Sequence, residues 1–228
     1  INVGESTHYI AGLSYENSSW LIDTELFYKD VKNITEFSLR FQNTNLNSLF
    51  FNGDGKVKGF ETLIQKKIDK YTGWVSYTYI DAENIFPLLN YGNPFPAPNT
   101  QKNEFKVFNN YEINGWNFSL NFIYGSGKAF TEPSYNYNIT LLDESELNYI
   151  GVGPKNGSLI PDYHRLDISV HHIFNIQKSK GDIGISVFNL YNKINTWYYE
   201  YNFDQRPYAR QTKKYLGLIP NVSFKLTF

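Results

Sequence analysis

The feature that most constrains the fold is an alternation of apolar and polar residues with period two, repeated in segments of about ten residues. In residues 116–125 every even position is apolar or aromatic, and the first three odd positions are Asn117, Ser119 and Asn121. Successive residues of a β-strand point to opposite faces of a sheet, so this segment has one apolar face and one polar face. About ten tilted residues are enough to cross a bilayer. The pattern therefore predicts two-faced strands of membrane-spanning length.

Nine such segments follow one another, which predicts an all-β antiparallel fold. They are residues 7–15, 20–29, 56–68, 73–80, 104–113, 116–125, 163–174, 182–192 and 215–228. Short links at residues 16–19, 69–72, 114–115 and 176–181 alternate with long links at 34–54, 82–103, 126–162 and 195–213. Asn114 and Gly115 suit the positive φ angles of a two-residue type I′ turn, so this link is the strongest hairpin signal.

The strict alternation of short and long links places all tight turns at one end of the sheet and all long loops at the other. This layout is typical of outer-membrane barrels, whereas a soluble sandwich or propeller has no reason to sort its loops by length. Aromatic pairs flank three of the short turns, as expected in the headgroup zone, although any hairpin tolerates a cross-strand aromatic pair. They are Tyr15 and Trp20, Tyr71 and Trp74, and Tyr111 and Trp116. We predict a transmembrane antiparallel β-barrel.

Composition excludes several other classes of protein. No apolar run approaches the roughly 18 residues of a spanning helix, so a helical membrane protein is excluded. The net charge is −1 without a basic stripe, so nucleic acid is not expected as a partner. The absence of Cys excludes a disulfide framework, a thiolate metal site and a cysteine nucleophile.

The strand count indicates a piece of a larger barrel. Nine is odd, whereas a finished bacterial barrel has an even number of strands. The sequence also contains no Met, and it starts at Ile1 without a secretory signal. We expect at least one more strand before Ile1. An open sheet in lipid leaves unpaired backbone groups at its edges, so we expect the piece not to be stable alone.

Five short stretches occur in the order and spacing of a known family. They are residues 55–61 (GKVKGFE), 76–79 (SYTY), 124–129 (YGSGKA), 161–167 (PDYHRLD) and 188–193 (FNLYNK). The first resembles a strand in which a basic, Gly-containing run precedes an inward Glu61. The fourth is similar to a P-x-Y-x-R-x-D strand start, and the fifth to an N-L-(F/Y)-N strand. With the terminal Phe228 they span residues 55–228 and resemble the carboxy-terminal β-barrel portion of TonB-dependent outer-membrane receptors, with Asn- and Tyr-rich loops similar to the Bacteroidetes type.

The resemblance implies that residues 1–228 are the carboxy-terminal part of a 22-stranded barrel, about nine to ten strands of it. It implies a bacterial outer-membrane location, and a plug domain and TonB-contacting segment that are absent from this chain. The partners it implies are the TonB–ExbB–ExbD complex, reached through the plug, and the barrel-assembly machinery. Outer-membrane lipid and a surface lipoprotein are the other partners that we expect. No cofactor is expected.

Candidate ligand-binding residues are aromatic side chains on the long loops and outer strand ends, where rings stack on a sugar or a chelate or form the outer aromatic belt. They are Tyr135, Tyr137, Tyr149, Trp197, Tyr198, Tyr199 and Tyr201. The carboxy-terminal residues are similar to the signal that outer-membrane proteins present to their assembly machinery. This assembly signal consists of Val222, Phe224, Leu226 and Phe228.

Catalytic and metal sites are not predicted. His171 and His172 are adjacent in a strand, so they point to opposite faces and cannot ligate one ion together. Arg165 and Asp167 share a face, and we expect a salt bridge inside the lumen. No motif places a nucleophile beside a base, and residues 151–157 lack the Gly-Lys-Ser/Thr ending of a phosphate loop. We expect no enzyme activity.

The predicted function is active import of a scarce extracellular siderophore, oligosaccharide or peptide with TonB-coupled energy. Two alternatives remain open. One is a passive porin or a structural barrel subunit of a surface complex, which a gene without an upstream plug would favour. The other is a soluble β-rich sugar-binding module, which an isolated chain that stays soluble and monomeric without detergent would favour.

Overall fold

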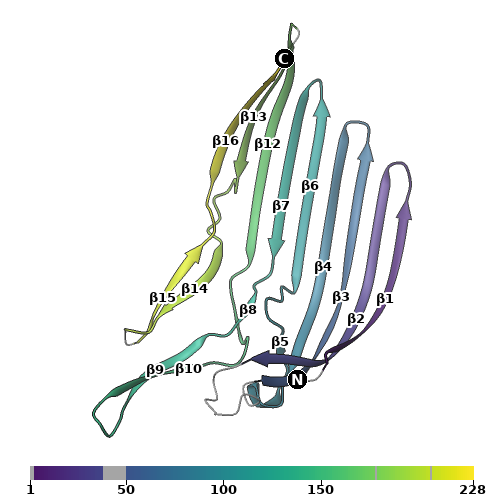
Figure 1. Ribbon diagram of the computed structural model, residues 1–228. Helices are drawn as coiled ribbons and strands as arrows, with labels where there is room; N and C mark the ends of the chain where they lie inside the picture. The colour runs from purple at the N-terminus through teal and green to yellow at the C-terminus, as the bar shows by residue number, and fades with distance from the viewer. Residues whose placement is uncertain (1–2, 38–49, 178, 206) are drawn as a thin grey trace.

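The computed structural model describes residues 3–37, 50–177, 179–205 and 207–228. Nine long strands form one antiparallel sheet in chain order, curved and not closed (Figure 1). They are β1 (Glu5–Glu16), β2 (Trp20–Phe37), β3 (Phe50–Ile68), β4 (Tyr71–Ile85), β6 (Asn103–Ile113), β7 (Trp116–Gly125), β12 (Tyr163–Ile176), β13 (Ser179–Phe188) and β16 (Ile219–Thr227). All nine predicted strands are confirmed. In the described part of the chain, no helix is long and apolar enough to cross a membrane.

The pairing register gives the sheet one apolar face and one polar face. Residues directly opposite each other in an antiparallel pair point to the same face. One row across six strands consists of Tyr71, Tyr111, Phe118, Val170, Ile185 and Val222. The adjacent row consists of Thr72, Asn110, Ser119, Ser169, Ser186 and Asn221. The predicted alternation is therefore confirmed as two continuous surfaces.

The connections are sorted by length between the two ends of the sheet. The short turns β1–β2, β3–β4, β6–β7 and β12–β13 lie together at one end, here called the turn end, and the carboxy terminus lies beside them (Figure 1). The opposite end, with the long connections, is called the loop end. Asn114 and Gly115 have φ angles of 49° and 80°, as a type I′ turn requires.

A small apolar core lies at the loop end. Phe51, Phe86, Leu89 and Phe95 are buried and pack together with Ile34. These side chains come from the ends of β2 and β3 and from the connection that contains the 3-10 turn η2 (Asn90–Gly92) and β5 (Phe95–Pro96), which pairs with β4. Among the described residues, the buried hydrophobic side chains are Phe51, Ala82, Phe86, Leu89, Phe95 and Ala129.

The apolar face of the sheet, by contrast, is exposed along its length. Leu26 and Val222 expose 59% and 70% of their surface, and Phe118 exposes 42%. Within the described residues, no second protein layer buries this face. A soluble sandwich or sugar-binding module would bury such a surface against a second sheet, so the soluble alternative is disfavoured.

The long connections contain structure that the sequence analysis did not predict. Two hairpins, β9–β10 (Pro133–Thr140 and Glu146–Val152) and β14–β15 (Thr196–Asn202 and Ala209–Lys214), extend from the loop end, and β8 (Ala129–Phe130) pairs with β11 (Ser158–Leu159). The strands β2, β3 and β4 also run further into the predicted loops than expected. The rest of the predicted loop 34–54, residues 38–49, lies outside the described residues.

Two predicted strand boundaries are wrong. Residues 189–192 were predicted as strand, but β13 ends at Phe188, and Asn189 and Asn192 have positive φ angles of 54° and 52°, which end extended structure. Residues 215–218 were also predicted as strand, whereas β16 begins at Ile219. Both errors lie at the loop end, where side chains replace the backbone ladder.

The aromatic pairs at the short turns are confirmed in two cases and wrong in one. Tyr15 and Trp20 belong to apolar rows, and Lys66 Nζ lies 4.8 Å from the centre of the Trp20 ring. Tyr111 and Trp116 also point to the apolar face. Trp74, however, is three residues from Tyr71 in the same strand, so it points to the opposite, polar face. Its ring stacks on Phe108 with 6.1 Å between the ring centres.

The two faces are tested by placing the same charge on each. Leu120 lies mid-strand in β7, opposite Ile168 on the apolar face, and Asn121 lies opposite Asp167 on the polar face. Leu120→Arg should destabilise the assembled barrel by about 2 to 4 kcal/mol, because the guanidinium would enter hydrocarbon. Asn121→Arg should assemble at the wild-type yield. Equal yields of folded full-length protein in the outer membrane, measured for both variants, would contradict the assigned faces.

Candidate ligand-binding surface at the loop end

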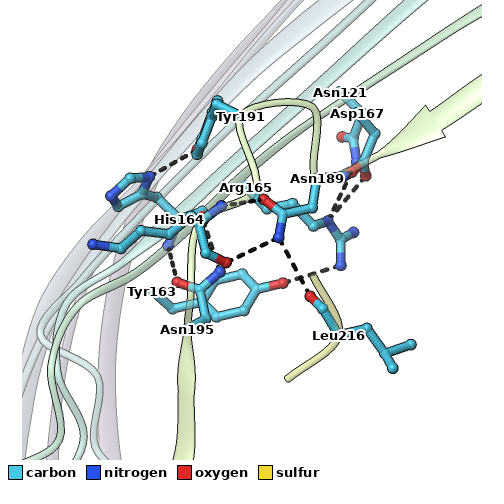
Figure 2. A network of polar contacts seen from close by, with 10 residues as sticks. Asn121, Tyr163, His164, Arg165, Asp167, Asn189, Tyr191, Asn195 and Leu216 are labelled. Atoms are coloured by element: carbon cyan, nitrogen blue, oxygen red, sulfur yellow. Dashed lines mark hydrogen bonds and ion pairs between the residues drawn. The ribbon is translucent and has the colours of Figure 1, made fainter. Parts of the chain in front are cut away.

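Two buried asparagines connect the last strands at the loop end (Figure 2). Asn189 is completely buried and Asn195 is 2% exposed. The Asn189 amide accepts a hydrogen bond from Lys193 N at 3.0 Å and donates to Lys193 O at 2.9 Å and to Leu216 O at 3.3 Å. The Asn195 amide bonds in the same way with His164, accepting from its N at 3.1 Å and donating to its O at 2.9 Å. Each side chain thus replaces a backbone partner where the ladder between strands has ended.

Arg165 and Asp167 form the ion pair that was predicted for them. Arg165 Nε donates to Asp167 at 3.0 Å, Nη1 donates to Tyr163 Oη at 3.0 Å, and the guanidinium lies 4.0 Å from the centre of the Phe188 ring. Asp167 Oδ1 also accepts from the backbone N of Asn189 at 2.9 Å. The ion pair therefore bonds to the same turn as the asparagine contacts. It holds the amino-terminal end of β12, which lies at the loop end, against the turn that follows β13.

The two hairpins of the loop end contact each other through polar groups, between the base of β9–β10 and the residues of β14–β15 that lie near its tip. Glu132 accepts from Ser158 Oγ at 3.0 Å, from Arg210 Nη1 at 3.2 Å and from Tyr201 Oη at 3.4 Å. Tyr208 Oη donates to the carbonyl of Pro133 at 2.6 Å. Burial raises the pKa of the Tyr201 phenol, with the nearby Glu132 carboxylate adding to the effect, so the hydroxyl stays protonated and can donate.

Asparagines of β9–β10 add hydrogen bonds to the tip of the other hairpin. Asn136 Nδ2 donates to the carbonyls of Phe203 and Gln205, each at 3.2 Å, and Asn148 Nδ2 lies 3.5 Å from the carbonyl of Phe203. Asn136 and Asn148 lie on the same face of the β9–β10 hairpin. This face of β9–β10 is therefore the one that holds β14–β15.

The seven candidate ligand-binding aromatics separate into different environments. Tyr199 and Tyr201 are half-buried. The ring centre of Tyr199 lies 5.5 Å from that of Phe130 in β8 and 4.6 Å from the guanidinium of Arg210 in β15, and Tyr201 Oη donates to Glu132. The ring centre of Trp197 lies 5.0 Å from that of Tyr198 and 5.8 Å from that of Tyr215. Both Trp197 and Tyr198 remain exposed.

The other three candidates form a continuous group. Tyr137 contacts Tyr135 at 5.8 Å and Tyr149 at 5.3 Å between ring centres. All three rings lie on the face of β9–β10 opposite to Asn136 and Asn148. The structure therefore brings Tyr135, Tyr137 and Tyr149 together, and it gives Tyr199 and Tyr201 packing roles within the protein.

The polar face of the sheet contains a groove of about 550 Å³ over β1 to β4. Its lining includes Asp23, Glu25 and Glu61, and none of its lining residues is basic. Glu25 and Glu61 are directly opposite each other in the register of β2 and β3. Like charges in this position repel each other, so this part of the wall favours a cationic surface in front of it.

The histidine pair has the arrangement expected from strand geometry. His171 Nδ1 lies 3.3 Å from Asp182 Oδ1, whereas the His172 ring stacks on Trp116 at 4.3 Å on the apolar face. In the described residues, no three His, Asp or Glu side chains come together in a group that could hold a metal ion.

Asn136, Asn189 and Asn195, which hold the loop end together, were not predicted from the sequence. Residues 188–193 were identified as a family motif, but the motif was assigned to a strand, and its structural role is a turn. A signal was present in the recurrence of Asn at 189, 192 and 195, because Asn readily adopts positive φ and bonds to nearby backbone groups. Asn136 gave no local signal, since its partners are distant in the chain.

Removing the Asn189 amide should destabilise the loop end. Asn189→Ala leaves Lys193 N and O and Leu216 O without this partner, which should lower the free energy of unfolding by about 2 to 4 kcal/mol. Asn189→Gly should show most of the same loss, because Gly tolerates the positive φ and lacks only the amide. The exposed Asn175 of β12, whose side chain makes no hydrogen bond to the described residues, provides a control, and Asn175→Ala should change stability by less than about 1 kcal/mol. Urea unfolding of the full-length protein in lipid vesicles measures these differences, and equal midpoints for all variants would contradict the assigned role.

The contact between the hairpins is tested with two asparagines on the same face of β9. Asn136 bonds to the other hairpin, whereas Asn138 bonds to Glu146 within its own hairpin. Asn136→Ala should increase amide hydrogen exchange in β14 and β15 roughly fivefold, as expected for the loss of about 1 kcal/mol. Asn138→Ala should leave β14 and β15 unchanged. The same exchange rates in both variants would show that the hairpins are not coupled through Asn136.

Comparison with known proteins agrees with this geometry. The family model described as "TonB dependent receptor-like, beta-barrel" matches residues 5–190. No curated protein matches the sequence. Among solved structures, the chain is similar to the ferric citrate transporter FecA in its unliganded form, with a TM-score of 0.62 and 17% identity over 97% of this chain and 31% of FecA.

Two further solved structures show the same fold. The pyoverdine outer-membrane receptor FpvA from Pseudomonas aeruginosa PAO1 has a TM-score of 0.65 and 12% identity over 99% of this chain and 30% of that chain. The copper transporter OprC has a TM-score of 0.61 and 14% identity over 98% of this chain and 31% of that chain. The chain thus spans about a third of the length of these proteins.

The family match covers most of the chain, and the sheet has the strand order, the two faces and the sorted loops of an outer-membrane barrel. The loop end is accordingly the extracellular end, and the turn end is periplasmic. The chain belongs to the TonB-dependent receptor β-barrel family of the bacterial outer membrane.

Proposed function

We propose that this chain forms part of the wall and the extracellular surface of an active importer. The loops at the extracellular end capture a scarce ligand, and the ligand passes inward along the polar face. Energy comes from the TonB–ExbB–ExbD complex, acting on a plug outside this chain. The observation that carries the proposal is the match of residues 5–190 to the TonB-dependent receptor family together with the polar face of the sheet. The proposal contains no catalytic step and no cofactor.

The acidic groove supports a plug inside the barrel. Glu25 and Glu61 lie opposite each other, and the residues that line the groove offer them no basic partner. Two carboxylates held side by side are stabilised by an opposing cationic surface. A plug with basic side chains at this height of the wall would supply that surface, and its displacement would then open the path.

Small scarce ligands are the class of cargo that we favour. FecA is described as a ferric citrate transporter, FpvA as a pyoverdine receptor and OprC as a copper transporter. Identities of 12–17% relate these proteins to the chain by fold alone, so the siderophore, oligosaccharide and peptide classes remain candidates. Capture needs enclosure and a few directed polar groups, and the exposed aromatics Tyr135, Tyr137, Tyr149, Trp197 and Tyr198 are the residues that we assign to it.

The carboxy-terminal strand is proposed as the contact with the barrel-assembly machinery. Val222, Phe224 and Leu226 lie opposite Ile185, Ile183 and Gly181 in an apolar row of β16 and β13, and Phe228 is 95% exposed at the turn end. Within the described sheet, β16 pairs with β13. A strand with regularly spaced apolar side chains suits strand-by-strand recognition. A surface lipoprotein remains a predicted partner at the loop end.

Dependence on cellular energy tests the import proposal. Cells that carry the full-length receptor are given three sets of probes, which are radioactive ferric chelates, labelled neutral oligosaccharides and labelled peptides. One set should accumulate only when the receptor is present. Accumulation should be lost in a TonB deletion strain or with a protonophore, whereas binding at the cell surface should persist.

Two outcomes would contradict active import. Receptor-dependent accumulation that continues without TonB would identify a passive porin. A correctly assembled receptor that accumulates none of the three probe sets would favour a structural barrel subunit of a surface complex.

A further inference from the structure

The β9–β10 hairpin has two faces with different chemistry. One face carries Asn136 and Asn148, which bond to the tip of β14–β15. The other face carries Tyr135, Tyr137 and Ile139 opposite Gly151, Tyr149 and Leu147. We call these three aromatic and two aliphatic side chains, with Gly151, the tyrosine face. Because the asparagine face is held by another part of the protein, the tyrosine face is directed away from that contact.

The rings of the tyrosine face form one connected group. Tyr135 and Tyr137 stack with an interplanar angle of 27°, and Tyr149, directly opposite Tyr137 on β10, lies at 42° to it. A Cβ atom at Gly151 would lie 2.2 Å from the Tyr135 ring, so this ring lies across Gly151 against the backbone. Tyr135, Tyr137 and Tyr149 expose 53%, 45% and 42% of their surfaces. The group is therefore an aromatic platform that is open on its outer side.

The ligand of such a platform is limited by charge. The side chains of the tyrosine face are Tyr, Ile and Leu, with no acidic or basic group. The charged Glu146 of the same hairpin lies on the asparagine face and bonds to Asn138. An anionic chelate would find no cation on this face. A neutral molecule with flat C–H surfaces and many hydroxyls would find ring faces for stacking and phenol groups for hydrogen bonds.

The ligand is also limited by area. The hairpin register contains seven residue pairs. With about 3.4 Å per residue and about 4.8 Å between strands, one face covers roughly 24 Å by 10 Å, or about 240 Å². A specific protein partner needs about 800 Å² on each side. The tyrosine face is too small for such a partner, and its narrow, elongated shape suits a linear oligomer.

From charge, shape and ring geometry together, we propose that the tyrosine face binds neutral oligosaccharide, with one sugar ring stacked on Tyr135 and the next on the cross-strand pair of Tyr137 and Tyr149. This inference rests on the proposed import function, because it assigns the ligand class of the same extracellular surface. It gives Tyr137 the central position, since this ring contacts both of the others.

Binding by the purified full-length receptor in detergent tests the proposal. The probes are an array of neutral glucans, xylans and mannans, with polygalacturonate and ferric citrate as anionic comparisons. Wild-type receptor should bind neutral oligosaccharides in preference to both anions. Tyr137→Ala should weaken this binding about tenfold, and Tyr137→Phe, which keeps the ring, should weaken it no more than about threefold.

A matched control comes from the tip of the same hairpin. Leu142 is fully exposed and lies in the turn between β9 and β10, outside the tyrosine face. Leu142→Ala should bind like wild type. Circular dichroism and the hydrogen exchange of β14 and β15 should be unchanged in Tyr137→Ala, which shows that the hairpin is still folded and anchored.

The proposal is overturned if no neutral oligosaccharide binds, or if Tyr137→Ala binds like wild type. TonB-dependent uptake of a ferric chelate or a peptide, unaffected by Tyr137→Ala, would also overturn it while leaving active import intact. Conversely, neutral oligosaccharide binding that needs Tyr137, without any TonB-dependent uptake, would support the tyrosine face and contradict the import function.

Discussion

The bilayer imposes the constraint on which the rest of the structure depends. Inside hydrocarbon there is no water to bond backbone amides, so each strand must pair fully with its neighbours, and one side of every strand must be apolar. The nine strands meet this demand through registers that align Phe118, Val170 and Ile185 in an apolar row and Ser119, Ser169 and Ser186 in the adjacent polar row. Only the outer edges of β1 and β16 lack a neighbour within the described sheet.

Outside the membrane, backbone groups need not all pair between strands. Where β13 ends at Phe188, the ladder is replaced by the side chains of Asn189 and Asn195, which are buried and bond to backbone groups of Lys193 and His164. Water is available there, so hairpins can leave the sheet, cross-brace each other through Asn136 and Glu132, and present one face outward. The wall of the barrel is thus determined by the period-two pattern of its strands, whereas the extracellular surface is determined by polar contacts between its loops.

This difference explains what the sequence could and could not predict. The strands and their faces were predicted because a strand that crosses a bilayer requires strict alternation of apolar and polar residues. The Asn114–Gly115 turn was predicted because this pair suits the positive φ angles of a type I′ turn. Trp74 was expected in the headgroup zone but points to the polar face, because the aromatic pairs at the turns were considered without the parity of the strand. The end of β13 at Phe188 was missed because positive φ at Asn189 breaks an alternation that continues in the sequence. The start of β16 at Ile219 was missed because Leu216 O and Leu218 N bond to the side chains of Asn189 and Asn192. The separation of Tyr199 and Tyr201 from Tyr135, Tyr137 and Tyr149 depends on partners far away in the chain, which local patterns cannot reveal.

Scanning β7 with single cysteines tests the two-faced wall most directly, since this part of the chain has no native Cys. Spin labels at positions 117 to 122, in the full-length receptor without other cysteines and in lipid vesicles, report contact with oxygen in hydrocarbon or with a water-soluble nickel chelate. The account predicts oxygen contact at 118, 120 and 122 and lower oxygen contact at 117, 119 and 121, with a period of two. Equal accessibility at even and odd positions, or protection of the even positions from lipid, would contradict it.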